Sequence, residues 1–211
     1  MIKININDVE KPKEHPDDLM KAMFDKQMQL AIKYQDIEKM GNLLKETATN
    51  VDTANGQKWI KDFAWRVTEE LCEAKEAYDA MENSIQEKDP SSYIDDHYQH
   101  YLEELIDALH FLIELTIISG YTSKIVNINS YRTDDNFNVV YFLGLMCNCL
   151  KNKPWKQTQM LTDRQKFEGY LEKTWQAFMG IFNRLDISKG EVYDLYFKKN
   201  AVNQFRQRSK Y

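Results

Sequence analysis

The chain has 211 residues, a length typical of one domain, and 43% of them are hydrophobic. That share of apolar residues is enough to fill a core, which excludes a disordered chain. The formal net charge of −5 argues against nucleic acid as the main partner. We therefore expect a single domain over residues 1–211, with residues 1–16 as a possible N-terminal arm.

The composition favours helices over strands. Only seven glycines and four prolines interrupt the chain, and Lys, Glu, Gln, Leu and Met, which favour helices, are abundant. The spacing of apolar residues predicts six helices, at residues 17–44, 57–81, 93–118 and 136–150, and from 162 and from 188 onward. Short connections between helices that share one core predict an all-α bundle of about six helices.

The starts and ends of these helices also carry sequence signals. Thr162 with Gln165, and Ser188 with Glu191, have the spacing of a capping box and mark the starts of the last two helices. Gly120 is expected to end the third helix in a left-handed conformation. That third helix is apolar nearly all round toward its C-terminal end, which places it in the middle of the bundle.

The cysteines and the apolar stretches indicate the compartment. Three cysteines are too few for a disulfide framework, so we predict reduced, buried thiols at Cys72, Cys147 and Cys149. The first eight residues lack the pattern of a signal peptide, and the longest apolar stretch, residues 108–118, is too short to span a membrane. We expect a soluble cytoplasmic protein with no membrane partner.

Two pairs of acidic residues on neighbouring helices are the first candidates for chemistry. Glu70 with Glu73, and Glu104 with Asp107, are each three positions apart and therefore adjacent on a helix surface. If the helices face each other, four carboxylates form the oxygen-rich environment that Mg²⁺ or Mn²⁺ prefers. Acidic pairs are also common on solvated helix faces, so the spacing alone leaves both interpretations open.

The C-terminal segment has the opposite charge. Residues 196–211 contain five basic and no acidic side chains. Lys199, Asn203 and Arg206 recur at helical spacing on one face, and Lys and Arg side chains bind phosphate oxygens. A solvated basic tail is the alternative, but together with the acidic pairs the segment favours a phosphate-binding site.

These features resemble the all-α nucleoside triphosphate pyrophosphohydrolases, which include the MazG-type enzymes, the dimeric all-α dUTPases and the bacteriophage dCTP/dUTP pyrophosphatases. Glu70-Leu-Cys-Glu73 and Glu104-Leu-Ile-Asp107 are similar to their Glu-x-x-Glu and Glu-x-x-Asp motifs. The His110-Phe111 dipeptide and the closing segment, residues 196–211, resemble the dimeric dUTPases in particular. The resemblance extends from about residue 17 to the C-terminus.

The resemblance implies a Mg²⁺-dependent enzyme that converts dUTP and water to dUMP and pyrophosphate. The four acids would hold two or three Mg²⁺ ions, with Mn²⁺ as a possible substitute, and Glu73 would accept a proton from the attacking water. The phosphates would be bound by Lys199, Asn203, Arg206 and Tyr211. A homodimer is also implied, in the cytoplasm of a bacterium or of a phage-infected host.

Two further residues complete the predicted site. Gln27 on the first helix occupies a place where the family reads the base edge with an amide. His110 lies three residues after Asp107 on a buried helix, and we expect it to hydrogen-bond to a metal-ligating carboxylate. A histidine satisfied within the core is the alternative.

Other substrates and another class of function stay open at this level. Residues 77–83 lack the Lys- and Trp-rich stretch of the bacterial and protozoan dimeric dUTPases, so dCTP or a broader set of deoxynucleoside triphosphates is the alternative substrate. Trp59 and Trp65, which precede the first acidic pair, are expected in the core. A non-enzymatic helical binding module is the alternative of a different class. Attack at the α- or the β-phosphorus also stays open.

Overall fold

The computed structural model describes residues 6–126, 136–150 and 162–208. Within these ranges the chain forms seven α-helices, two short 3-10 helices and no strand, which confirms the predicted all-α class. The α-helices are α1 (Leu19–Tyr34), α2 (Thr47–Asn50), α3 (Ala54–Glu87), α4 (Ser91–Ile118), α5 (Asn136–Cys149), α6 (Arg164–Arg184) and α7 (Lys189–Arg208). The 3-10 helices are η1 (Ile6–Asp8) and η2 (Ser123–Ile125).

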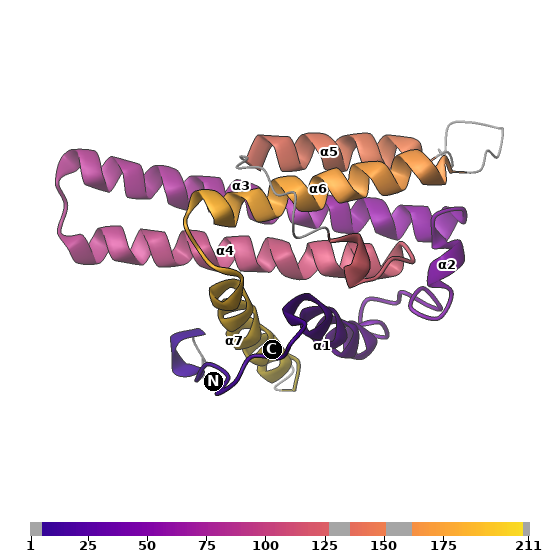
Figure 1. Ribbon diagram of the computed structural model, residues 1–211, viewed down its shortest axis with the longest axis horizontal. Helices are drawn as coiled ribbons and strands as arrows, with labels where there is room; N and C mark the ends of the chain where they lie inside the picture. Colours follow the sequence, from indigo (N-terminus) through magenta and orange to yellow (C-terminus); the bar gives the residue numbers. More distant parts are fainter. Residues whose placement is uncertain (1–5, 127–135, 151–161, 209–211) are drawn as a thin grey trace.

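The long antiparallel pair α3 and α4 is the centre of the fold (Figure 1). Helices α5 and α6 pack together along one side of this hairpin, and α1 and α7 lie on the other side against α4 (Figure 1). Helix α4 is thus enclosed, and its C-terminal half is buried almost without interruption, as its apolar sequence predicted. Large side chains such as Trp175, Tyr101 and Tyr196 fill the core between the layers.

The observed helix ends agree with the local signals at several places. Ser188 and Glu191 form the predicted capping box, in which each side chain accepts a hydrogen bond from the other residue's backbone N–H. Gly120 has the expected positive φ, +87°. Helix α3 is longer than predicted and ends before Lys88, which adopts the left-handed conformation.

Two predicted boundaries were wrong. The first helix ends at Tyr34 rather than near residue 44, because the chain then turns through Lys39 and Gly41, both with positive φ. Helix α6 is capped by Asp163, whose carboxylate accepts from the N–H of Lys166, and not by Thr162.

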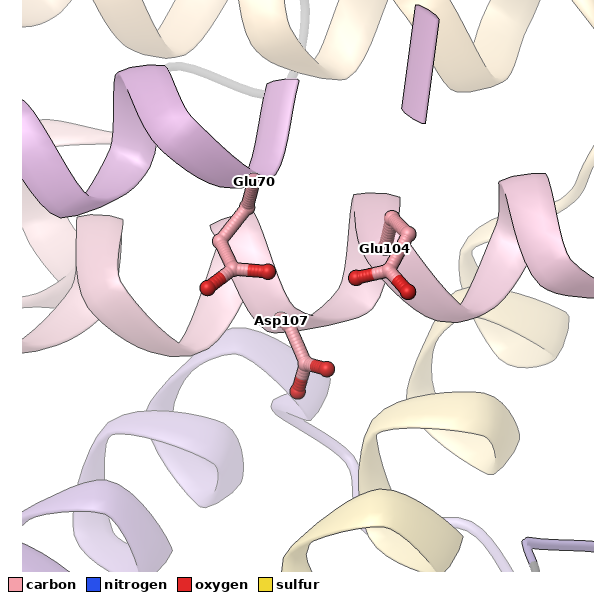
Figure 2. Close-up of side chains that lie close together, drawn as sticks. All are labelled: Glu70, Glu104 and Asp107. Atoms are coloured by element: carbon pink, nitrogen blue, oxygen red, sulfur yellow. The ribbon is translucent and has the colours of Figure 1, made fainter. Parts of the chain in front are cut away.

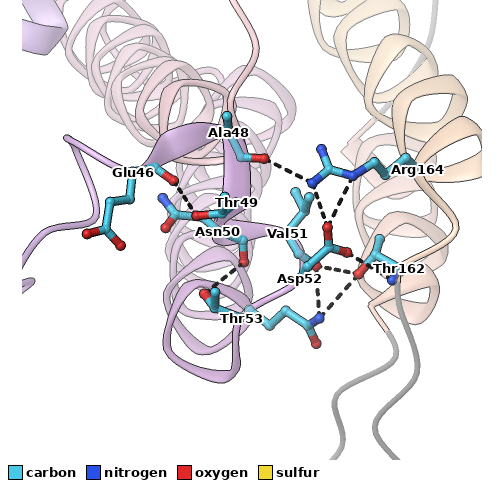
Figure 3. A network of polar contacts seen from close by, with 10 residues as sticks. Glu46, Ala48, Thr49, Asn50, Val51, Asp52, Thr53, Thr162 and Arg164 are labelled. Atoms are coloured by element: carbon cyan, nitrogen blue, oxygen red, sulfur yellow. Dashed lines mark hydrogen bonds and ion pairs between the residues drawn. The ribbon is translucent and has the colours of Figure 1, made fainter.

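Thr162 belongs instead to a polar network that joins the segment around α2 to the start of α6 (Figure 3). Its hydroxyl donates to the carbonyl oxygen of Val51, while Arg164 donates to the carboxylate of Asp52 (Figure 3). The amide of Asn50, at the end of α2, donates to the carbonyl oxygens of Leu43 and Ile118. Buried contacts of this kind satisfy backbone groups that the turns leave unpaired.

Three side chains lie elsewhere than predicted. Cys72 is exposed and Cys147 is half-buried, so only Cys149 is a buried thiol as expected. Trp59 packs partly buried against the core, but Trp65 is 62% exposed because it lies on the outer face of α3. In the described ranges, no helix has the combination of length and apolarity needed to cross a bilayer.

Candidate active site

Three of the four predicted metal-ligating carboxylates meet between α3 and α4. Glu70 projects from α3 toward Glu104 and Asp107 on α4 (Figure 2), and one oxygen of each lies within 4.8 Å of the others. The antiparallel packing of the two helices brings these distant positions together. Glu104 is buried and the other two are half-buried, so the cluster is largely shielded from water.

The carboxylates are hard to ionise together. Burial, the charge of Asp107 and the contact with Glu104 raise the pKa of Glu70 to about 8. Burial likewise raises the pKa of Asp107 to about 6, although the ammonium of Lys199 opposes the shift. A group of oxygen ligands that repel one another in this way fits a hard divalent cation, which would stabilise all three as carboxylates.

Glu73, the fourth predicted ligand, lies one turn further along α3 and is exposed. It is not among the three oxygens that converge, but its charge is close enough to add to the raised pKa of Glu70, after burial and the two α4 carboxylates. The structure therefore places Glu73 beside the cluster.

Lys199 connects the cluster to α7. This lysine is 3% exposed, and its Nζ lies 2.6 Å from both Glu103 Oε1 and Asp107 Oδ2. Burial alone would lower the pKa of Lys199, but the two carboxylates raise it above its usual value. Glu103 was missed by the sequence analysis, since it resembles any other exposed acid on an amphipathic helix.

A cavity of about 300 Å³ opens beside the cluster. Helices α1, α3, α4 and α7 all contribute to its wall. Six residues predicted for the site line it: Gln27, Glu70, Asp107, His110, Asn203 and Arg206. The structure thus brings the acidic, basic and amide candidates to one place. Tyr211 lies outside the described residues.

Comparison with known families decides the family of the chain. A family model described as dUTPase matches residues 19–211, a range that includes the carboxylate cluster and every helix of the cavity wall. The chain belongs to this dUTPase family. It is therefore a dUTP diphosphatase of the all-α group and acts on a nucleotide substrate. Searches of curated proteins and of solved structures found no match.

Gln27 lies at the centre of a buried polar network in this enzyme. Its Oε1 accepts from His110 Nδ1, at 2.7 Å, and from the hydroxyl of Tyr196, at 2.9 Å. Its Nε2 donates to Glu114 Oε2 at 2.7 Å. Gln27 is only 2% exposed, so these three contacts fix the orientation of its amide.

His110 makes a contact different from the predicted one. Burial, with a smaller effect of the Lys199 charge, lowers the pKa of His110 to about 3, so the imidazole is neutral. Its single proton lies on Nδ1, because Gln27 Oε1 can only accept. The ring stacks on Tyr196, with centroids 4.2 Å apart. Among the described residues, Nε2 has no hydrogen-bond partner, and His110 orients Gln27 rather than a metal-ligating carboxylate.

The wall of the dUTPase cavity also contains an ion pair that the sequence analysis missed. Arg66 donates from Nη1 and Nη2 to the two oxygens of Glu38, at 3.1 and 2.7 Å. Its guanidinium lies over the rings of Phe63 and Phe111, 4.6 and 5.6 Å from their centroids. No local spacing rule links Glu38 to Arg66, so only the fold reveals the pair.

Proposed function

We propose that this dUTP diphosphatase depends on Mg²⁺ and that Glu70, Glu104 and Asp107 hold the ion. The convergence of these three carboxylates within 4.8 Å carries the proposal. Carboxylate oxygens are the ligands that Mg²⁺ prefers, and substrate phosphates complete its coordination. Glu73, exposed beside Glu70, is the proposed fourth acid. By analogy with the family we propose two or three ions, with Mn²⁺ as a substitute.

The reaction converts dUTP and water to dUMP and pyrophosphate. A divalent cation supplies positive charge to the triphosphate and makes water a better nucleophile at neutral pH. Glu73 accepts the proton of the attacking water, a role that suits its exposed position next to the cluster.

The residues of α7 bind the triphosphate. Asn203 and Arg206 line the cavity and offer donors to phosphate oxygens. Lys199 has three N–H bonds, of which Glu103 and Asp107 use two, and we assign the third to a phosphate oxygen. We assign the same role to Tyr211. The base then lies at the end of the cavity lined by Gln27 and Glu114.

We propose a homodimer as the assembly. Ile37 and Trp65 are 63% and 62% exposed. Large apolar side chains on the surface, such as these two, are typical of a subunit interface.

Pyrophosphate release from dUTP tests the proposal, with Mg²⁺ present or removed by chelation. We expect activity with Mg²⁺ and its loss in Glu104→Gln, while Glu76→Gln, an exposed acid on α3, keeps it. Calorimetric titration with Mg²⁺ measures the site without turnover and should show weaker binding in Glu104→Gln only. Full activity under chelation would overturn the metal dependence. Absence of pyrophosphate release from every nucleotide tested would favour the non-enzymatic helical binding module.

A further inference from the structure

The edge of the cavity next to Gln27 has a fixed hydrogen-bonding pattern. His110 donates to Gln27 Oε1. The single hydroxyl hydrogen of Tyr196 can reach Gln27 Oε1, at 2.9 Å, or the carbonyl oxygen of Met23, at 3.1 Å, and the contact with Gln27 is the shorter. These two contacts occupy Oε1, so we assign no ligand to this oxygen. Nε2 carries two N–H bonds, and Glu114 takes one of them. Gln27 can therefore offer a ligand one donor and no acceptor.

Glu114 provides the adjacent acceptor. Its Oε2 accepts from Gln27, whereas Oε1 receives no hydrogen bond from any residue that the structure describes. The side chain is 6% exposed and lines the cavity. A donor on Gln27 and an acceptor on Glu114 thus lie side by side at the cavity wall.

The negative charge of Glu114 has no cation paired with it in the described part of the chain. Arg66 is the nearest candidate, but its hydrogen bonds go to Glu38 and Asp62. Burial accordingly raises the pKa of Glu114 to about 7, while the Gln27 contact and the Arg66 charge lower it. A buried carboxyl without a pair is costly to the fold, and such groups in cavities are candidates for function.

We propose that Glu114 selects the base, by accepting the imide N3–H of uracil on Oε1 while Gln27 donates its second N–H to the neighbouring carbonyl. A carbonyl lies on each side of uracil N3–H. The adjacent acceptor and donor can therefore bind N3–H together with either of the two carbonyls. Cytosine in the same pose presents an unprotonated N3, whose lone pair faces the carboxylate. The inference rests on the base position proposed above.

A purely structural role for Glu114 would be to hold Gln27 in place. Glu114→Gln separates the two roles because it keeps the side-chain shape. Its amide oxygen can still accept from Gln27, and its NH₂ group then faces the base, where it opposes uracil N3–H and suits cytosine N3. We expect the ratio of kcat/KM for dUTP over dCTP to fall about 100-fold. If Glu114 only holds Gln27 in place, kcat/KM should fall by a similar factor for dUTP and for dCTP.

The pH dependence of the wild type is a second measurement. The charged or titratable groups that interact with Glu114 are Glu38, Arg66, Tyr34 and Tyr196. Protonated Glu114 can donate to cytosine N3, so we expect the preference for dUMP over dCMP, measured by calorimetric binding, to narrow from pH 8 to pH 6. In Glu114→Gln this pH dependence should vanish, whereas Glu76→Gln should keep it.

The outcomes separate this inference from the proposed chemistry. A folded Glu114→Gln enzyme with the wild-type dUTP-to-dCTP ratio overturns the inference and leaves Mg²⁺-dependent hydrolysis intact. A wild type that prefers dUMP over dCMP but needs no Mg²⁺ overturns the metal proposal and supports the inference. Equal binding of dUMP and dCMP by the wild type at pH 8 also overturns the inference.

Discussion

The ammonium of Lys199 and the carboxylate of Asp107 form an ion pair, with Nζ 2.6 Å from Oδ2. A residue predicted to bind phosphate therefore contacts a residue predicted to bind metal. Glu103, one turn away from Asp107 on α4, contacts the same Nζ at the same distance. Helix α7 is thereby attached to α4 through charge at the site itself, and substrate binding is coupled to how these helices pack.

Replacing Lys199 by Met should destabilise the fold. The substitution leaves Asp107 and Glu103 without a cation in a half-buried position, and because both retain some exposure we expect a loss of about 2 kcal/mol. Urea unfolding measures it. Lys198→Met, at the adjacent and less buried position, should change the free energy of unfolding by less than about 0.5 kcal/mol. Equal effects at the two positions would contradict the ion-pair interpretation.

Gly56 near the start of α3 should tolerate no side chain. A Cβ there would lie 2.2 Å from the backbone oxygen of Asn50, and backbone atoms cannot move aside cheaply. We expect Gly56→Ala to cost more than about 2 kcal/mol, visible as a lower Tm. Gly169→Ala in α6, where a Cβ meets nothing within 4 Å, should instead stabilise the protein by about 0.5–1 kcal/mol. An unchanged Tm in Gly56→Ala would show that α2 and α3 do not pack this closely.

Stability should fall as the pH rises because of Glu114. Its pKa is about 7 in the folded protein and 4.5 when unperturbed, so between these values the folded state binds more protons than the unfolded state. The linkage relation then predicts a loss of about 3 kcal/mol from Glu114 between pH 4.5 and pH values above 7. Chemical unfolding at pH 5 and pH 8 measures it. Glu114→Gln should lose correspondingly less unfolding free energy between pH 5 and pH 8. The same pH dependence in the variant and the wild type would refute the assignment of this effect to Glu114.

The helices themselves were largely predictable. Apolar spacing along α3, α4 and α5 is a local property, and the Ser188–Glu191 capping box acts within one turn, so both are legible in the sequence. The errors at Tyr34 and Thr162 have a different origin. The helical spacing of apolar residues continues past Tyr34, although the helix ends there and the chain turns. The Thr162 hydroxyl does not cap the helix because it donates a buried hydrogen bond to Val51, which is remote in the sequence.

By itself, the sequence determined the all-α class, the two acidic pairs and the basic face of α7, because each depends on residues within a few helical turns of one another. Only the tertiary structure decided which charges meet. Three contacts between polar or charged side chains join different segments of the chain: Gln27 with Glu114, Lys199 with Glu103, and Arg66 with Glu38. Hydrogen bonds and ion pairs act over a few ångströms, so the partner of a buried polar group is set by helix packing and not by its place in the sequence.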